Sequence, residues 1–235
     1  MNNKITKIVG YHSGRHDVSY SILENGVPLI HEELERLLRV KEPPGDGLSM
    51  YFERIGKEEN VKHFTFGNIN EQGEVRGVTP EAQMMMESVI KENSGKHWVF
   101  GHHKSHAANA FFSSNFEEAL IFTIDGGGIE EDKFATALTI WEGKDNKINL
   151  IERIPITTLN LGSPWRLYTE KIFGLSSGYP IGNQVGTVMA LACVGDPDKY
   201  YDDFYKGFTV GGGGHNPVTW ANCEKYKSIA EESEQ

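Results

Sequence analysis

An Asn-Gly pair between two apolar runs is the feature that most limits how this chain can fold. Residues 18–23 and 27–31 are rich in aliphatic residues, and Asn25-Gly26 lies between them. This arrangement is typical of a hairpin with a two-residue turn. Another β-like run, residues 5–11, precedes the hairpin. We therefore expect the chain to open with at least three strands, the last two antiparallel.

Helical and strand patterns alternate after this opening. Leucines at 34, 37 and 38 give the charged segment 32–41 a helical spacing, and Thr79-Pro80 supplies an N-cap and a first helical residue. Further strands are expected over 63–66, 98–101 and 119–125, a hairpin over 135–141 and 148–154, and helices over 48–59, 105–112, 165–173 and 184–193. Together these patterns predict an α/β fold with a mixed sheet, as in the ribonuclease-H-like lobe of the actin, sugar-kinase and Hsp70 superfamily.

Composition limits the size, the partners and the compartment. With 235 residues, 38% of them hydrophobic, the chain can bury one substantial core and the start of a second lobe. Its 23 basic and 33 acidic residues give a net charge of −10, which repels phosphate backbones, so nucleic acid is not expected as a partner. Its two cysteines form no C-x-x-C pair, and we expect no signal peptide and no membrane span. These features predict a cytoplasmic protein.

The last 25 residues differ in character from the rest. Four consecutive glycines at 211–214 precede a polar, acidic end of the chain. We therefore expect one domain over residues 1–210, followed by a flexible loop and polar tail over 211–235.

Two histidines and an aspartate form a candidate metal site. His102 and His106 are four residues apart, so in a helix they would lie on one face, one turn apart. Asp125 follows the apolar run 120–124, and at the end of a strand it would lie at the carboxyl edge of the sheet. Two imidazoles and one carboxylate leave coordination positions open, which suits Fe(II) best, with Mn(II) and Zn(II) as alternatives. Such an ion could polarise a carbonyl or phosphoryl oxygen, or activate a hydroxyl.

Other interpretations of this segment exist. Histidines four apart also arise by chance, where they cap a helix or line a surface, and His103 could replace one of the ligands at a less favourable spacing. Zinc peptidase chemistry is disfavoured, because the H-E-x-x-H motif needs a glutamate where His103 stands. Gly126 and Gly127, expected in a turn after the strand, are candidates for binding a nucleotide phosphate through backbone N–H groups.

Four segments in order resemble the NodU/CmcH/TobZ-type O-carbamoyltransferases, whose N-terminal domain is similar to the Kae1/TsaD proteins of tRNA threonylcarbamoylation. They are residues 15–19 (RHDVS), 35–41 (ERLLRVK), 102–112 (HHKSHAANAFF) and 123–126 (TIDG). The resemblance implies an incomplete Kae1-like fold of the ribonuclease-H-like type. It also implies transfer of a carbamoyl group from carbamoyl phosphate, via a carbamoyl-adenylate made with ATP, to a hydroxyl of a small-molecule or sugar acceptor.

The resemblance also implies roles for single residues. It assigns metal binding to His102, His106 and Asp125, and places His16 and Lys41 at the carbamoyl donor. Lys41 would offer a cation to a phosphate or carbamoyl oxygen, and His16 could donate a hydrogen bond or transfer a proton.

The chain departs from the family pattern in two ways. Val185 and Thr187 stand where glutamate and lysine are usual. The rest of the Kae1-like domain, with a further aspartate for the metal, and the YrdC-like domain that makes the adenylate would have to be supplied in cis or by a separate chain. Two alternatives follow: a noncatalytic metal- or phosphate-binding subunit that needs a partner, and an actin-like ATPase or kinase, which would give the histidine pair no role.

Overall fold

The computed structural model describes residues 5–12, 17–40, 60–67, 80–93, 95–158, 168–175 and 184–196, with single residues or pairs at 51, 54, 58, 69, 165, 198–199 and 201–202. The chain divides into two compact units. The first comprises residues 1–105 and 129–134, and the second comprises residues 106–128 and 135–235. The boundary after Ser105 lies inside helix α4 (His102–Phe112).

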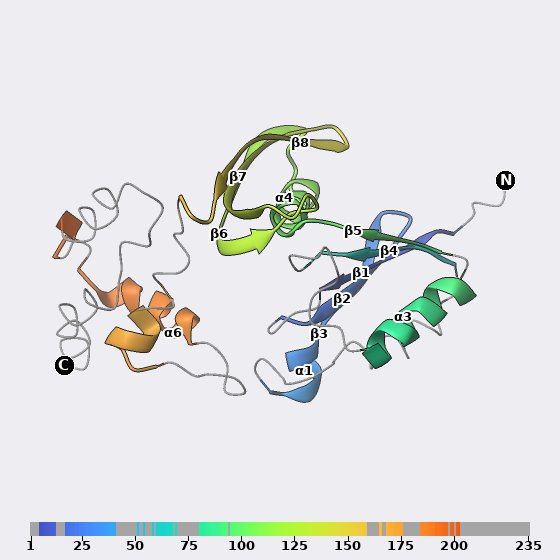
Figure 1. The fold of residues 1–235 in the computed structure, drawn as a ribbon, viewed down its shortest axis with the longest axis horizontal. Coiled ribbons are helices and arrows are strands. Elements are labelled where there is room, and N and C mark those ends of the chain that lie inside the picture. The colour runs from blue at the N-terminus through green and yellow to red at the C-terminus, as the bar shows by residue number, and fades with distance from the viewer. Residues whose placement is uncertain are drawn as a thin grey trace. The chain divides into compact units, whose positions relative to one another are not determined.

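The first unit is built on a five-stranded mixed sheet in the order β3-β2-β1-β4-β5 (Figure 1). Its strands are β1 (Lys7–His12), β2 (Ser19–Glu24), β3 (Val27–Glu33), β4 (Val61–Phe66) and β5 (Lys96–Val99). β1 pairs antiparallel with β2, and β2 with β3, whereas β4 is parallel to both β1 and β5. The predicted mixed α/β sheet is confirmed. Its antiparallel opening and parallel continuation are those of a ribonuclease-H-like lobe.

The predicted hairpin joins β2 and β3. Asn25 and Gly26 form its turn with φ values of 50° and 85°, in the left-handed region that Asn-Gly turns require. Helix α1 (Leu34–Leu38) follows directly. It is shorter than the predicted segment 32–41, because Glu32 and Glu33 belong to β3 and Arg39 ends the helix in a left-handed conformation, φ 56°.

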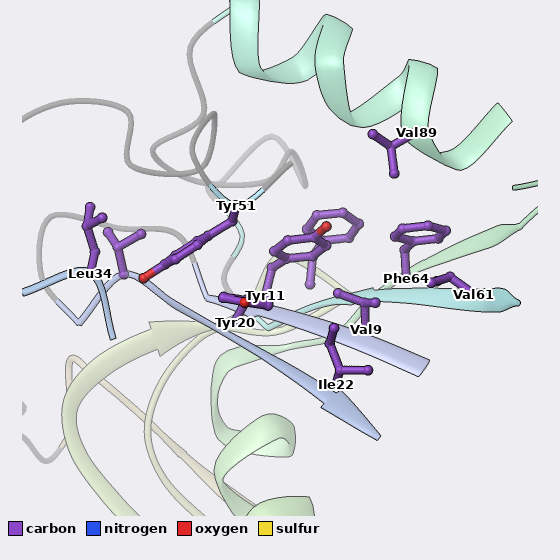
Figure 2. Close-up of a cluster of buried hydrophobic side chains, with 11 residues drawn as sticks. Val9, Tyr11, Tyr20, Ile22, Leu34, Tyr51, Val61, Phe64 and Val89 are labelled. Atoms are coloured by element: carbon purple, nitrogen blue, oxygen red, sulfur yellow. The ribbon is translucent and has the colours of Figure 1, made fainter. Parts of the chain in front are cut away.

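Helix α3 (Pro80–Glu92) covers one face of this sheet. Val89 is buried, and Met85, Met86 and Ile90 pack partly buried against the same core. Figure 2 shows Val89 directed from the helix toward the strands that carry Val61 and Phe64.

Alternate residues of the strands form the core of the first unit. Val9 and Tyr11 of β1, Tyr20 and Ile22 of β2, and Phe64 and Phe66 of β4 are all buried. The rings of Tyr11 and Phe66 stack with centroids 5.2 Å apart. Each such side chain stabilises the fold by about 1.5–3 kcal/mol relative to its exposed state.

The second unit contains a three-stranded sheet in the order β6-β7-β8, made of β6 (Glu118–Ile129), β7 (Ala135–Lys144) and β8 (Lys147–Pro155). β7 and β8 are antiparallel, which confirms the second predicted hairpin. Ala107 and Phe111 of α4 pack with Ile121 and Trp141 of this sheet in a separate core. Gly143 makes this packing possible, since a Cβ there would come 2.6 Å from the Phe111 ring.

Two helical segments follow in the second unit. Residues Tyr168–Ile172 form one π-helical turn, and α6 (Val185–Leu191) continues into a 3₁₀ turn, Ala192–Val194. Most of the predicted helix 48–59 and all of the tail 211–235 lie outside the described residues. Among the helices in the described ranges, none is long and apolar enough to cross a lipid bilayer.

Candidate metal centre

Helix α4 brings the two histidines onto one face. It starts at His102, one turn earlier than the predicted helix 105–112, so both His102 and His106 are helical. Gly101 is its N-cap, because the Gly101 carbonyl accepts the N–H of Ser105 at 3.0 Å. His102 is half-buried and His106 is exposed.

Strand β6 presents Asp125 on its inner face. Ile121 and Thr123 are buried and Asp125 is half-buried, whereas Leu120, Phe122 and Ile124, which alternate with them, are each more than half exposed. Ile121 belongs to the core that Ala107 and Phe111 of α4 share, so Asp125 lies on the strand face directed to α4.

The three predicted ligands come together in the structure. Asp125 Oδ2 lies 3.6 Å from His106 Nε2. One nitrogen from each of His102 and His106 and one oxygen of Asp125 all lie within 4.8 Å of one another. In the described part of the chain, no other set of three His, Cys, Asp or Glu residues is grouped in this way.

This donor set fits a divalent ion of the first transition row. Ligand atoms about 2.0–2.2 Å from a common ion are at most about 4.4 Å apart, so small side-chain rotations would close the set. The other oxygen of Asp125, Oδ1, accepts the backbone N–H of Gly126, which orients the carboxylate.

The prediction that the strand ends at Asp125 and is followed by a glycine turn is wrong. β6 continues through the glycines to Ile129, so Asp125 lies within the strand and not at its end. Gly127 has φ 137°, and a Cβ there would come 3.2 Å from Cγ1 of Ile156. Gly127 thus combines a positive φ with a close approach of the Ile156 side chain inside a strand, which sequence alone does not distinguish from a turn.

His103 does not share the metal group. It is fully buried, and its ring meets the ring of His102 edge-on at a centroid distance of 5.3 Å. Of the other predicted residues, His16 and Lys41 lie outside the described residues, while Val185 and Thr187 lie in α6.

Glu130 is a feature of this region that sequence reasoning missed. Only 5% of the residue is exposed, and its Oε1 accepts the backbone N–H of His103 at 2.8 Å. Burial raises the pKa of this carboxyl, although the backbone N–H groups of His103 and Lys104 act in the opposite direction. No sequence pattern around Glu130 indicates that its hydrogen-bond partner is the first turn of α4, 27 residues earlier in the chain.

Comparison with known proteins identifies relatives over part of the chain. The nodulation protein NolNO of Sinorhizobium fredii is 38% identical over 114 residues, which cover 47% of this chain and 15% of NolNO. Protein sll1178 of Synechocystis is 35% identical over 103 residues, 43% of this chain and 14% of that protein. The chain therefore corresponds to a small part of these relatives.

Among solved structures, the PPX-GPPA enzyme of Aquifex aeolicus is similar with a TM-score of 0.37 and 15% identity, over 82% of this chain and 65% of that chain. The family model described as Carbamoyltransferase N-terminus matches residues 51–230. This range includes His102, His106 and Asp125, whereas His16 and Lys41 precede it. A match over more than half of the chain shows that the chain belongs to the carbamoyltransferase family, in the N-terminal region of its members.

Proposed function

We propose that this chain forms the metal-binding part of an O-carbamoyltransferase. The proposed reaction moves a carbamoyl group from carbamoyl phosphate, via a carbamoyl-adenylate formed with ATP, to a hydroxyl of a small-molecule or sugar acceptor. The observation that carries this proposal is the group of two imidazoles and one carboxylate on α4 and β6, in a chain of this family.

His102, His106 and Asp125 would bind the metal, with Fe(II) as the first choice and Mn(II) or Zn(II) as alternatives. A bound ion supplies Lewis-acid chemistry at a carbonyl, phosphoryl or hydroxyl oxygen. Asp125, held by the N–H of Gly126, contributes the anionic ligand. The strand conformation of Gly126 and Gly127 gives no support to a phosphate loop, so the proposal assigns them no phosphate contact.

Two further residues complete the proposed chemistry. Lys41 would contribute a cation for a phosphate or carbamoyl oxygen, and His16 would donate a hydrogen bond or transfer a proton. The remaining Kae1-like half and a YrdC-like domain, in cis or as a separate chain, would supply the adenylate and the rest of the acceptor site.

The metal assignment is tested by replacing each ligand. Protein purified without chelator and loaded anaerobically with Fe(II) should bind about one ion per chain, measured by elemental analysis. His102→Ala, His106→Ala and Asp125→Ala should each weaken binding at least about tenfold, since each removes a direct ligand. His97→Ala, at an exposed position of β5, is the matched control and should bind as the wild type does. Unchanged binding in all three variants would place the ion elsewhere, and absence of binding by the wild type would overturn the assignment.

A noncatalytic binding subunit is the second candidate. It is favoured by the uncharged Val185 and Thr187 in α6, where the family pattern has glutamate and lysine. Formation of AMP and a carbamoylated alcohol by the chain alone would eliminate this candidate. The ATPase or kinase alternative loses its main support, because the glycines that suggested a phosphate turn lie inside β6.

A further inference from the structure

Helix α4 begins without a side chain of its own to cap it. Its N-cap is Gly101, and the N–H groups of the first helical residues have no acceptor within the helix. A capping side chain ordinarily accepts the N–H of the second or third helical residue, which here are His103 and Lys104.

Glu130 takes over this capping role from a distant part of the chain. Its Oε1 accepts the N–H of His103 at 2.8 Å, and its carboxylate also accepts a hydrogen bond from the backbone of Lys104. The carboxylate lies against Gly101, where a Cβ would come 2.8 Å from Cδ and 2.9 Å from Cα of Glu130. Glu130 therefore occupies the space that the side chain of an ordinary N-cap residue would fill.

We propose that Glu130 is a positioning residue for the metal centre. Because it fixes the backbone of His103 and Lys104, it fixes the first turn of α4 and the direction of the His102 imidazole. Glu130 is not itself a ligand: it lies outside the group of His102, His106 and Asp125. This inference rests on the proposed metal site, and it adds a residue that neither the motif nor the ligand geometry includes.

The test compares Glu130 with its neighbour Glu131. Glu130→Leu removes both acceptor oxygens at similar size, whereas Glu130→Gln keeps one carbonyl oxygen. Glu131→Gln is the matched control, because Glu131 also contacts the first turn, through an exposed ion pair with Lys104 at 2.8 Å. Co(II) serves as the probe, since its visible absorption reports both affinity and coordination geometry. Amide exchange at His103 and Lys104 and urea unfolding are measured in parallel.

We expect Glu130→Leu to weaken Co(II) binding at least about tenfold and to change the absorption spectrum, since a supporting contact of a ligand typically contributes about 10–100-fold in affinity. Glu130→Gln should recover part of the affinity, and Glu131→Gln should match the wild type. If Glu130→Leu does not fold, the Co(II) affinity and absorption spectrum of Glu130→Gln decide whether Glu130 positions the metal centre.

The outcomes separate this inference from the proposed function. A wild type that binds no Co(II) would overturn the metal site and the positioning role together. Binding by the wild type with the same affinity and spectrum in both Glu130 variants would overturn the positioning role alone. Faster amide exchange and lower stability without a change in Co(II) binding would likewise reduce Glu130 to a helix cap.

Discussion

At the scale of single residues, Gly101 shows how little room surrounds the start of α4. A side chain there would meet the backbone of Glu130, with the added Cβ 2.9 Å from its Cα. We expect Gly101→Ala to lower the free energy of unfolding by about 1–3 kcal/mol, because the contact forces a backbone shift. Urea unfolding measures the change. Gly186→Ala is the control: no atom lies within 4 Å of its added Cβ in α6, so it should be neutral or stabilising by up to about 1 kcal/mol. Equal effects at both positions would contradict the packing seen at Gly101.

Glu32 gives a prediction for the pH dependence of stability. Partial burial opposes its ionisation, but hydrogen bonds from Arg54 and Tyr20 outweigh this effect and hold the pKa of Glu32 below its ordinary value of 4.5. A lowered pKa in the folded state stabilises the fold above the ordinary value, and this contribution is lost as the pH falls through the folded value. Glu32→Gln should therefore lose less stability than the wild type between about pH 5 and pH 3.

Urea unfolding at several pH values in this range measures that difference. Arg54→Gln should flatten the acid dependence in the same direction, because it removes one of the donors that lower the pKa of Glu32. Parallel pH dependence in the wild type and in Glu32→Gln would show that the Arg54 and Tyr20 contacts do not act on stability.

The grouping of His102, His106 and Asp125 could be predicted because its signals are local. An i, i+4 pair of histidines and an aspartate after an apolar run are visible in short windows of sequence. Gly101 and Glu130 could not be predicted in this way. The cap of α4 comes from a residue beyond β6, and only the tertiary fold places the two together.

At the scale of elements, α3 depends on a narrow apolar contact with the sheet. Val89 is 7% exposed and packs in the core, whereas Met84 of the same helix is 63% exposed. We expect Val89→Ala to destabilise the protein by about 1–3 kcal/mol, through lost burial and a residual cavity. Met84→Ala should change stability by less than about 0.5 kcal/mol, and thermal or urea unfolding compares the two. Similar losses for both variants would mean that α3 does not use the face shown in Figure 2.

Elements with a clear local sequence signal, such as a specific turn or an apolar run, could be predicted, and the bounds of others could not. The sequence predicts both hairpins, because Asn25-Gly26 forms a specific turn and the apolar runs 135–141 and 148–154 flank a short polar segment. The start of α4 and the end of β6 were each misplaced. The glycines after Asp125 predict the end of the strand, yet β6 continues through them to Ile129. His102 is preceded by Gly101, which also occurs in turns and so does not by itself predict a helix start.

At the scale of the whole molecule, the described residues form two separate hydrophobic cores, one around Phe64 and one around Trp141. We expect each core to stabilise its own unit. Phe64→Leu should lower amide-exchange protection in β1 and β4 by about tenfold or more, with little change in β7 and β8. Trp141→Phe, which also removes a hydrogen bond to Thr139, should have the reverse distribution. Exchange mapped residue by residue measures both, and equal loss in both sheets from either variant would show a single cooperative unit.

The overall architecture was partly predictable. An antiparallel opening followed by alternating helices and strands indicated the mixed sheet, and the motifs indicated the carbamoyltransferase family. The division into two units was not visible, because one of its boundaries falls within a continuous helix and the short segment 129–134 returns to the first unit. Such a boundary depends on which contacts each residue makes in the folded chain.

Alternate residues of β6 face opposite sides of the strand, so the direction of Asp125 depends on its position in this alternation. Odd positions 121, 123 and 125 share the inner face, while even positions 120, 122 and 124 carry exposed apolar side chains. Inserting one residue between Ile124 and Asp125 would move Asp125 to the opposite face of the strand and turn its carboxylate away from His106. Inserting two would restore the orientation with the strand merely lengthened. The orientation of Asp125 toward α4 is therefore kept only by insertions or deletions of an even number of residues in β6.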